Sequence, residues 1–488
     1  MALKLYNTLT REKELFVPHE KNLVRMYNCG PTVYWRMQLG NIRAYANWDI
    51  LHRTLLYLGY DVDRVVNFTD VGHMTEDEDF GDDKIENTAR SEGKTPQEIS
   101  DHFINTVTQD FYSMNYLQPD GSQTRLDMTP DETKDHGWAR ATLHIEDMIA
   151  HNKMIEVNGF TYETEQALYF DVTKLPDYTK LSRQVLSDKL VGVRDEVIVD
   201  PNKKNPADFV LWMKRTGKYA KHLQHWESPW GDGFPGWHIE CSAMGCKYLG
   251  EYIDIHTGGV DHISVHHTNE RAQNIGAYGH EVVRFWLHNE FLTNKEGDKF
   301  SKSKGNAFTL VELREKGYDP LDLRYYFMSI HYRQPIRFSE DGLESAKNAR
   351  KSLIDKILSL VRGSESLDEG DILKTYDERF RESLMDDLNV SSALAVVSEL
   401  LGSESKDSDK VRTILEFDRV LGLRLRESIE KALEKDLPSE VQDLVDQRAK
   451  ARAEKDYQRS DDLRDRLKEM GYEVLDGVNG QDVRKIVL

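Results

Sequence analysis

Apolar and polar positions in the first third of the chain follow a strand–helix–strand pattern. Residues 23–27 form a short apolar run, which the sequence CGPT interrupts sharply. From Asn41 onward, apolar positions recur at helical spacing until Gly59 ends the run. Residues 62–66 then predict a second strand, which finishes at the sequence NFTD. This pattern is typical of a βαβ unit, whose ligands bind at the carboxyl ends of the strands.

A second unit of the same kind follows later in the chain. Residues 252–256 predict a strand, Gly258 and Gly259 predict a turn, and the sequence VHHTNE lies in the predicted helix that follows. Residues 285–291 predict the closing strand. The segment 117–208, between the two units, has a mixed pattern with many polar residues and ends in DPNKKNPAD. We therefore predict an α/β fold with a domain inserted between the halves of a Rossmann-type domain.

The rest of the chain is predicted to be mainly helical. Apolar positions recur at helical spacing after residue 320, and the acidic, serine-rich stretches GSESLDEGD and GSESKDSDK predict loops. From Pro438 the sequence predicts one basic amphipathic helix, QRAKARAEKDYQRSDDLRDRLKEMGYEV, and a short glycine-containing tail. This pattern adds a helical bundle and a small carboxyl-terminal domain to the predicted fold.

Composition narrows the class of protein. The chain has 488 residues, of which 39% are hydrophobic and 31% are charged, as in a globular protein with several domains. Three cysteines are too few for a disulfide framework, and the amino-terminal sequence lacks an apolar signal core, so we expect a cytoplasmic protein. The net charge of −20 argues against a generally basic nucleic-acid binder, although a local basic stripe could still bind RNA.

Four residues are candidate metal ligands. Cys29 lies in YNCGPTVY, Cys241 in GWHIECSAM, and His266 and Glu270 in VHHTNE, where their i, i+4 spacing puts both on one helix face. Two thiolates, an imidazole and a carboxylate form a ligand set that zinc accepts. Singly, each has an ordinary alternative, since Cys241 could be core packing and the histidine–glutamate pair could be a surface contact. Cys246 has no motif around it and is interpreted as structural.

The sequences YNCGPTVY, GWHIECSAM, DIHTGGVDH with VHHTNE, and KFSKSKGN together resemble cysteinyl-tRNA synthetase, a class I aminoacyl-tRNA synthetase. The resemblance runs nearly end to end and keeps the order of the family. It implies one Zn²⁺ per subunit, ATP with Mg²⁺, L-cysteine and tRNA-Cys as partners, no membrane, and a monomer. The implied segments are 1–116 and 209–292 for the halves of the catalytic domain, 117–208 for the inserted connective domain, 293–345 for the stem-contact region, 346–437 for the anticodon-stem helices and 438–488 for the anticodon-binding domain.

Two signatures imply where ATP is activated. PTVYWRMQLGN resembles the HIGH segment of class I enzymes, with Gly40 and Asn41 retained and Gln38 in place of the leading histidine. An amide still donates a hydrogen bond but carries no charge, so we expect retained and slower catalysis. Lys299 and Lys302 in KFSKS resemble the KMSKS loop, whose ammonium groups neutralise charge at the α-phosphate. In isolation such a basic loop is more often a solvated surface.

The resemblance assigns the remaining site residues. The residues implied to bind ATP are Gly40, His256, Gly258, Asp261 and Lys302; those for the amino acid are Cys29, Gly30, Thr69 and Trp237; and those for the tRNA backbone are Arg448, Arg452 and Arg464. The arginines could equally be a solvated helix face. Zinc is implied to select the substrate thiolate over the hydroxyl of serine, which an apolar pocket separates poorly.

Two other interpretations stay open at the level of sequence. One is the related ligase that joins cysteine to an amino sugar, which resembles a synthetase shortened at its carboxyl end. The other is a synthetase-like binding protein without catalysis, supported only by Gln38. The acidic run TEDEDFGDDK receives no role.

Overall fold

The computed structural model describes residues 2–72, 83–184, 200–294, 297, 308–361, 366–435, 438–477 and 480–485. Its contacts divide the chain into two compact units. The larger unit comprises Met1–Leu353 with Ser364–Leu423, and the smaller comprises Ile354–Gly363 with Arg424–Leu488.

A five-stranded parallel sheet forms the centre of the larger unit. Its strands lie in the order β11 (Val283–Asn289), β10 (Ile253–Gly259), β3 (Leu23–Asn28), β4 (Asp61–Phe68) and β5 (Trp138–Arg140). All neighbouring pairs are parallel. Because β3 is followed by β4 on one side and flanked by β10 on the other, strand order reverses at β3, which is where an open α/β sheet leaves a crevice for ligands. The predicted α/β fold is confirmed.

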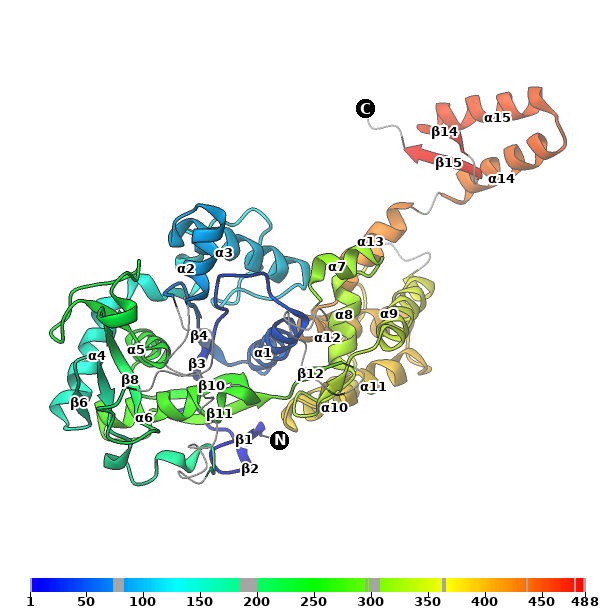
Figure 1. The fold of residues 1–488 in the computed structure, drawn as a ribbon. Helices are drawn as coiled ribbons and strands as arrows, with labels where there is room; N and C mark the ends of the chain where they lie inside the picture. The colour runs from blue at the N-terminus through cyan, green and yellow to red at the C-terminus, as the bar shows by residue number, and fades with distance from the viewer. Residues whose placement is uncertain are drawn as a thin grey trace. The chain divides into compact units, whose positions relative to one another are not determined.

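Helices cover both faces of this sheet (Figure 1). Alternate side chains of β3 point to opposite faces, as expected for a strand. Val24 and Met26 pack with the helix α1 (Leu39–Tyr57) in one core cluster. Tyr27 packs in another cluster with α5 (Trp237–Leu249). This second face also carries α4 (Ile145–Val157) and α6 (His266–Tyr278), which both pack on α5.

Both predicted βαβ units form, with small corrections. The first is β3–α1–β4, and its helix begins at Leu39, two residues before the predicted start. The second is β10–α6–β11. The prediction of a turn at Gly258 and Gly259 was wrong, because both residues continue β10 and pair with β11. The chain turns instead in the 3-10 helix Val260–His262.

The sequence between the two βαβ units forms a separate antiparallel sheet. Its strands, in order, are β6 (Thr161–Glu163), β7 (Ala167–Phe170), β8 (Phe209–Lys214) and β9 (Gly233–Pro235). The segment 117–208 therefore supplies β6 and β7 to this sheet and also β5 to the parallel sheet.

Further helices and short strands complete the larger unit. They are β1 (Lys4–Asn7), β2 (Glu12–Leu15), α2 (Lys84–Glu92), α3 (Pro96–Ser113), β12 (Leu292–Thr293), α7 (Leu310–Glu315), α8 (Pro320–Met328), β13 (Ile336–Arg337), α10 (Lys374–Met385), α11 (Val390–Leu401) and α12 (Asp407–Leu421). The helix α9 (Glu340–Val361) contributes residues to both units. The predicted loop GSESKDSDK is shorter than expected, because its last four residues begin α12.

The smaller unit corrects the prediction for the carboxyl-terminal sequence. The expected single helix is two helices, α14 (Ser439–Ala453) and α15 (Tyr457–Glu469), and the expected tail forms an antiparallel hairpin. Lys455 breaks the helix at a φ of 61°, and the Asp456 carboxylate caps α15. The remaining elements are α13 (Leu425–Lys435), β14 (Tyr472–Gly477) and β15 (Gly480–Lys485).

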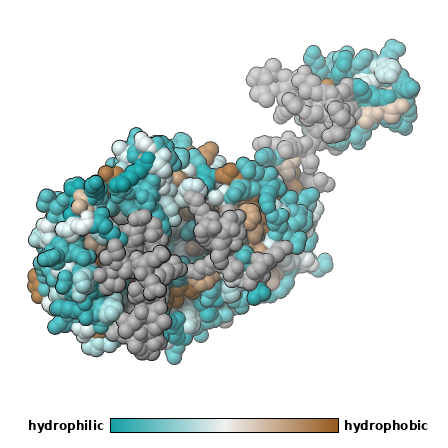
Figure 2. Space-filling model, in the orientation of Figure 1, coloured by the Kyte–Doolittle hydropathy of each residue, from teal (hydrophilic) through white to brown (hydrophobic). Residues whose placement is uncertain are grey.

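Buried ion pairs join α1 to α8 within the larger unit. The Asp49 carboxylate accepts from Arg53 Nε at 2.8 Å and from Arg324 Nη2 at 2.6 Å, and the three side chains are at most 5% exposed. The visible surface is mostly hydrophilic with separate small apolar patches (Figure 2). Among the described helices, none is long and apolar enough to cross a membrane.

Candidate active site and metal centre

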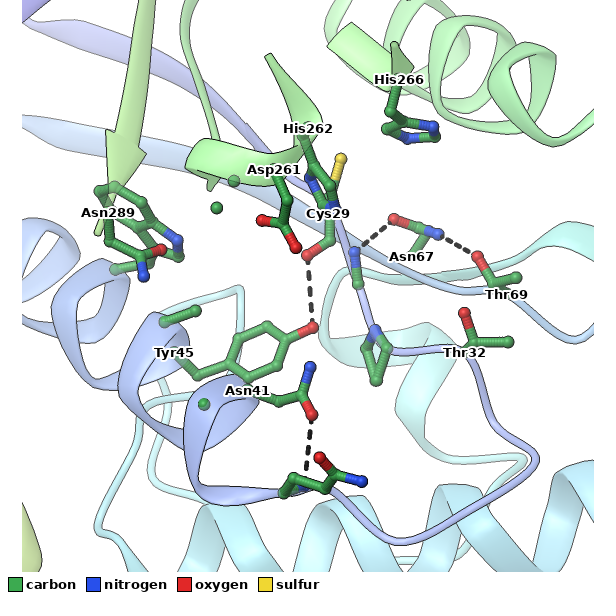
Figure 3. A pocket seen from close by; sticks show the side chains of 18 of the residues that line it. Cys29, Thr32, Asn41, Tyr45, Asn67, Thr69, Asp261, His262, His266 and Asn289 are labelled. Atoms are coloured by element: carbon green, nitrogen blue, oxygen red, sulfur yellow. Dashed lines mark hydrogen bonds between the residues drawn. The ribbon is translucent and has the colours of Figure 1, made fainter. Parts of the chain in front are cut away.

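A cavity of about 290 Å³ lies at the carboxyl ends of the parallel strands (Figure 3). Gly30 follows β3, Thr69 follows β4, Gly259 ends β10 and Asn289 ends β11, and all four line the cavity. The amino terminus of α1 closes another side through Gly40 and its neighbours. The site therefore lies where the strand order predicts a ligand.

A tight backbone approach after β3 shapes the wall of the cavity. The Gly30 N–H donates to Asn67 Oδ1 at 2.7 Å, and Asn67 Nδ2 donates to Thr69 Oγ1 at 2.9 Å (Figure 3). A Cβ atom at Gly30 would lie 1.4 Å from the carbonyl oxygen of Asn67. Only glycine fits at this position, which explains the Cys-Gly sequence.

The four candidate metal ligands meet beside this wall. One ligand atom from each of Cys29, Cys241, His266 and Glu270 lies within 4.8 Å of the others. The two Sγ atoms are 3.9 Å apart, and His266 Nε2 lies 3.0 Å from Glu270 Oε1. Cys241, His266 and Glu270 are at most 3% exposed. The fold thus brings together all four residues that the sequence singled out.

The ionisable side chains of this group shift one another's pKa values. Burial raises the pKa of the Cys29 thiol, and the neighbouring Cys241 sulfur raises it further. The hydrogen bond from Cys29 lowers the pKa of Cys241. Burial would lower the pKa of His266, but Glu270 and Cys241 raise it to about 10. Burial would raise the pKa of Glu270, but His256 and His266 lower it. The group therefore holds negative charge that His266 balances with a proton.

These residues fit a zinc ion. Thiolate, imidazole and carboxylate are its usual ligands. The distances of 3.9 Å between the two sulfur atoms and 3.0 Å between His266 Nε2 and Glu270 Oε1 are compatible with ligand atoms around one tetrahedral ion. Binding would replace the proton on His266, as metal binding to protonated ligands does. The three cysteines are free thiols, so no disulfide competes for Cys29 or Cys241.

Further histidines surround the metal group, and the sequence did not assign them to it. His267 Nε2 lies 3.2 Å from Cys29 Sγ, and its Nδ1 lies 2.8 Å from His288 Nε2. His238 Nδ1 lies 2.9 Å from His266 Nδ1. Cys29 and Glu270 also converge with His256 and His267 in an alternative four-residue group. The i, i+4 spacing of His266 and Glu270 gave no signal for His267, which reaches Cys29 at the end of β3 from the first turn of α6.

Predicted nucleotide contacts divide between the cavity wall and the interior. Gly258 and Asp261 line the cavity. His256 is not among its lining residues: it is 2% exposed, and its Nε2 lies 2.8 Å from Glu270 Oε2. His256 therefore lies behind Glu270, and its contact with adenosine stays a prediction. Trp237 lines the cavity, and its ring centroid lies 4.2 Å from that of His266.

The amino terminus of α1 carries the remaining predicted contacts. The Gln38 N–H donates to Asn41 Oδ1 at 3.2 Å, and both residues line the cavity (Figure 3). Among the described residues outside its own helical turn, no atom lies within 4 Å of a Cβ placed on Gly40, so the backbone there is open to a flat ligand. Lys299 and Lys302 lie outside the described residues.

Sequence reasoning missed two side chains that support the cavity. The Tyr45 hydroxyl donates to the carbonyl oxygen of Cys29 at 3.3 Å, and the Asn67 side chain binds both Gly30 and Thr69 (Figure 3). Asn67 begins the sequence NFTD at the end of β4, and that position at a strand terminus was a usable signal. The sequence around Tyr45 gave no such signal, because the position of Tyr45 in the helical pattern matches that of an ordinary core residue.

The three predicted tRNA-binding arginines differ in exposure. Arg448 on α14 is 1% exposed, so its guanidinium does not face solvent. Arg452 on α14 and Arg464 on α15 are exposed. The burial of Arg448 argues against the predicted phosphate contact for this residue.

Comparison with known sequences identifies relatives over the whole chain. The family model for the tRNA synthetases class I (C) catalytic domain matches residues 15–348, and that for the cysteinyl-tRNA ligase anticodon binding domain matches residues 434–484. A cysteine–tRNA ligase of Treponema denticola is 40% identical, covering 96% of this chain and 97% of the relative. One from Burkholderia lata is 38% identical, covering 99% and 96%.

Solved structures share the fold at low sequence identity. Mycobacterium tuberculosis methionyl-tRNA synthetase in complex with methionyl-adenylate superposes with a TM-score of 0.55 at 16% identity, over 86% of this chain and 94% of that one. A leucyl-tRNA synthetase from Agrobacterium radiobacter has a TM-score of 0.54 at 11% identity, over 85% of each chain. These likenesses concern the fold alone.

Proposed function

The chain belongs to the cysteinyl-tRNA synthetase family of class I aminoacyl-tRNA synthetases, and from this we propose that it is a cysteine–tRNA ligase. It activates L-cysteine with ATP to cysteinyl-adenylate and pyrophosphate, and it then transfers the cysteine to tRNA-Cys. The observation that carries the proposal is the buried group of Cys29, Cys241, His266 and Glu270 on the wall of a strand-end cavity.

These four residues are proposed to hold one Zn²⁺, which when bound supplies a soft ligand site for the thiolate of the substrate. Serine differs from cysteine by one atom, and its oxygen is harder and its hydroxyl far less acidic. A packed apolar pocket separates such similar groups by a modest factor, so a sulfur-selective group on the cavity wall explains discrimination without a second, editing site. Trp237 and Thr69 line the cavity beside the group and would contact the carbon chain of cysteine.

ATP is proposed to bind at the opposite end of the cavity, against the first turn of α1. The helix amino terminus directs N–H groups and partial positive charge toward the phosphates. Gly40 leaves room for the adenine, and Gly258 and Asp261 border the same space. The carboxylate of cysteine then attacks the α-phosphate in line, and the protein contributes positioning and charge neutralisation.

Gln38 and Asn41 are proposed to donate hydrogen bonds to the phosphates, and Lys299 and Lys302 to neutralise their charge. A neutral amide at position 38 keeps the donor that a histidine would supply and omits its positive charge. Mg²⁺ accompanies ATP as part of the substrate. Because Gln38 lies at the N-cap of α1, its side chain is on the phosphate side of the proposed nucleotide.

The smaller unit is proposed to contact tRNA. The anticodon binding domain model matches 434–484, and exposed Arg452 and Arg464 are the remaining candidates for phosphate contact. We keep the six predicted segments, a monomer and a cytoplasmic location as parts of the proposal. The match to 434–484 favours tRNA over an amino sugar as acceptor.

Cysteine-dependent exchange of pyrophosphate into ATP tests the first step. The proposal predicts exchange with cysteine and at least roughly a thousandfold less with serine, which corresponds to about 4 kcal/mol of discrimination. Absence of exchange from zinc-loaded, folded protein would support the non-catalytic alternative. Exchange without charging of tRNA-Cys, combined with ligation of cysteine to an amino sugar, would support the other ligase.

A further inference from the structure

A second group of buried ligand-type side chains lies outside the cavity. Asp83 precedes α2, Glu86 lies in the first turn of that helix, and His222 lies between β8 and β9. Their exposed fractions are 7%, 7% and 5%. One oxygen or nitrogen atom of each lies within 4.8 Å of the other two. The group shares no residue with the cysteine-containing group.

The contacts of His222 leave one ring nitrogen facing the two carboxylates. His222 Nδ1 lies 2.8 Å from the carbonyl oxygen of Gln224, which can only accept, so Nδ1 carries a proton. His222 Nε2 lies 3.0 Å from Asp83 Oδ2 and 3.8 Å from Glu86 Oε2. In spite of the short distance, neither Nε2 nor Asp83 Oδ2 makes a hydrogen bond of acceptable geometry with any described residue.

The outer oxygens of both carboxylates have other partners. Asp83 Oδ1 accepts from the Glu86 N–H at 3.0 Å, and Glu86 Oε1 pairs with Arg90. The inner oxygens are therefore left to face His222 Nε2. A proton there can bind one carboxylate, whereas a cation binds all three atoms at once.

We propose that Asp83, Glu86 and His222 bind a second divalent transition-metal ion, Zn²⁺ in the first instance. One imidazole nitrogen and two carboxylate oxygens are a ligand set for zinc and similar ions, and a carbonyl on the far ring nitrogen is the usual support of a metal-binding histidine. The set lacks sulfur, which separates it chemically from the group at Cys29.

The ion would join the start of α2 to the loop between β8 and β9, next to the chain that follows β4. A Cβ atom at Gly72 would lie 1.6 Å from Asp83 Oδ2, so the chain after β4 passes directly beside the site. The Gly72 N–H donates to Gln224 Oε1 at 2.8 Å, and Gln224 Nε2 donates to the Asp70 carbonyl at 3.0 Å. The bound ion would thereby fix the chain that continues from Thr69 in the cavity wall. Its role is structural, and the proposal goes beyond the ligase function and does not depend on it.

Metal content of the full-length protein tests the site. Protein purified with zinc and dialysed against metal-free buffer should contain two Zn²⁺ per chain, and His222→Gln should contain one. The matched control is His225→Gln, since His225 lies in the same loop, pairs with Asp232 at 2.7 Å and belongs to no ligand group among the described residues. The His225→Gln variant should contain two Zn²⁺ per chain. Equal zinc content in the wild type and in folded His222→Gln would overturn the proposal.

Cobalt substitution of the wild type decides the question even if His222→Gln does not fold. The metal-free protein is titrated with Co²⁺ and followed by absorption spectroscopy. Co²⁺ bound by thiolates gives an intense sulfur-to-metal band, so one equivalent should produce that band and another should add only weak visible bands. Cys241→Ser should lose most of the intense band and keep the weak ones. A single equivalent bound in total, or a second that adds a sulfur-to-metal band, would contradict the assignment.

Discussion

The Sγ atoms of Cys29 and Cys241 lie 3.9 Å apart, although the two residues are 212 positions apart in the sequence. Cys29 follows β3, and Cys241 lies in α5, which packs on the face of that strand. His266 and Glu270 reach the same point from the first turns of α6, which packs on α5. The metal group is thus assembled where α5 packs against the end of β3 and against α6.

Cys241→Ser should release one Zn²⁺ per chain and lower cysteine-dependent pyrophosphate exchange by more than roughly 100-fold, because serine is a poor ligand for this ion. Cys246→Ser is the matched control. The Cys246 thiol is buried, donates to Asn274 Oδ1 at 3.5 Å and lies outside the metal group, so zinc content should stay unchanged. Both variants are assayed for metal and exchange. Full zinc content and activity in Cys241→Ser would refute the ligand assignment.

Gly30→Ala and Gly40→Ala should separate folding from nucleotide binding. A Cβ at Gly30 would lie 1.4 Å from the Asn67 carbonyl, so this variant should lose thermal stability and the shape of the cavity wall. A Cβ at Gly40 meets no atom within 4 Å in the described part of the chain beyond its own helical turn, so that variant should fold normally. Its methyl group enters the proposed adenine space and should raise KM for ATP roughly tenfold, or by about 1.4 kcal/mol. Equal KM values for Gly40→Ala and wild type would place the adenine elsewhere.

Asp49→Asn should destabilise the larger unit by roughly 3–5 kcal/mol, because it leaves Arg53 and Arg324 buried without their carboxylate. Burial would raise the pKa of Asp49, but Arg53 and Arg324 lower it from 3.8 to about 2. The contribution of the ionised Asp49 carboxylate to the free energy of unfolding is therefore complete above about pH 4, and it is lost as the pH falls through about 2. Urea unfolding at pH 7.5 measures the effect.

The control for Asp49 is the exposed ion pair of Lys13 and Asp386, whose N···O distance is 2.7 Å. Asp386→Asn should cost less than about 1 kcal/mol, as exposed pairs do. Similar losses in the two variants would show that the buried pair contributes no more than a surface pair.

Asp110→Asn should stabilise the protein at neutral pH. Asp110 on α3 is 3% exposed, and Arg36 Nη1 lies 4.0 Å from its carboxylate. Burial raises the pKa of Asp110 from 3.8 to about 6, with Arg36 opposing. The folded state thus binds more protons between pH 4 and 6, so this group lowers stability as the pH rises through that window.

The gain in Asp110→Asn should be about 1–3 kcal/mol at pH 7.5, since one pKa unit corresponds to about 1.4 kcal/mol. At pH 4 the carboxyl is protonated in the folded state, and the gain should largely vanish. Thermal unfolding of variant and wild type at both pH values measures the difference. A gain of equal size at both pH values would rule out burial of the charge as the cause.

Sequence patterns were sufficient for both βαβ units and for the metal group. The units have long periodic helices and short apolar strands, and the ligands lie in distinctive motifs. The prediction of a turn at Gly258 and Gly259 was wrong, because glycine at the end of a strand can allow close packing instead of a turn. A Cβ atom at Gly258 would lie 2.6 Å from His262 Nδ1. The local sequence does not show which neighbouring residue leaves no room for a side chain at the glycine.

Residues that act through tertiary contacts could not be placed from sequence. His267 reaches Cys29 because α6 begins beside the end of β3, and His256 lies against Glu270 because β10 runs next to that helix. Arg448 has the appearance of a solvated basic residue in sequence, yet it is 1% exposed. The break at Lys455 depends on one residue with positive φ, which helical periodicity does not signal.

Charging of a tRNA-Cys transcript with labelled cysteine tests the central claim most directly. The zinc-loaded protein is given ATP, Mg²⁺ and either cysteine or serine, and acid-precipitable aminoacyl-tRNA is measured over time. We expect charging with cysteine, none detectable with serine, and activity in spite of Gln38 at the HIGH-like position. No charging with cysteine by folded, zinc-loaded protein would contradict it.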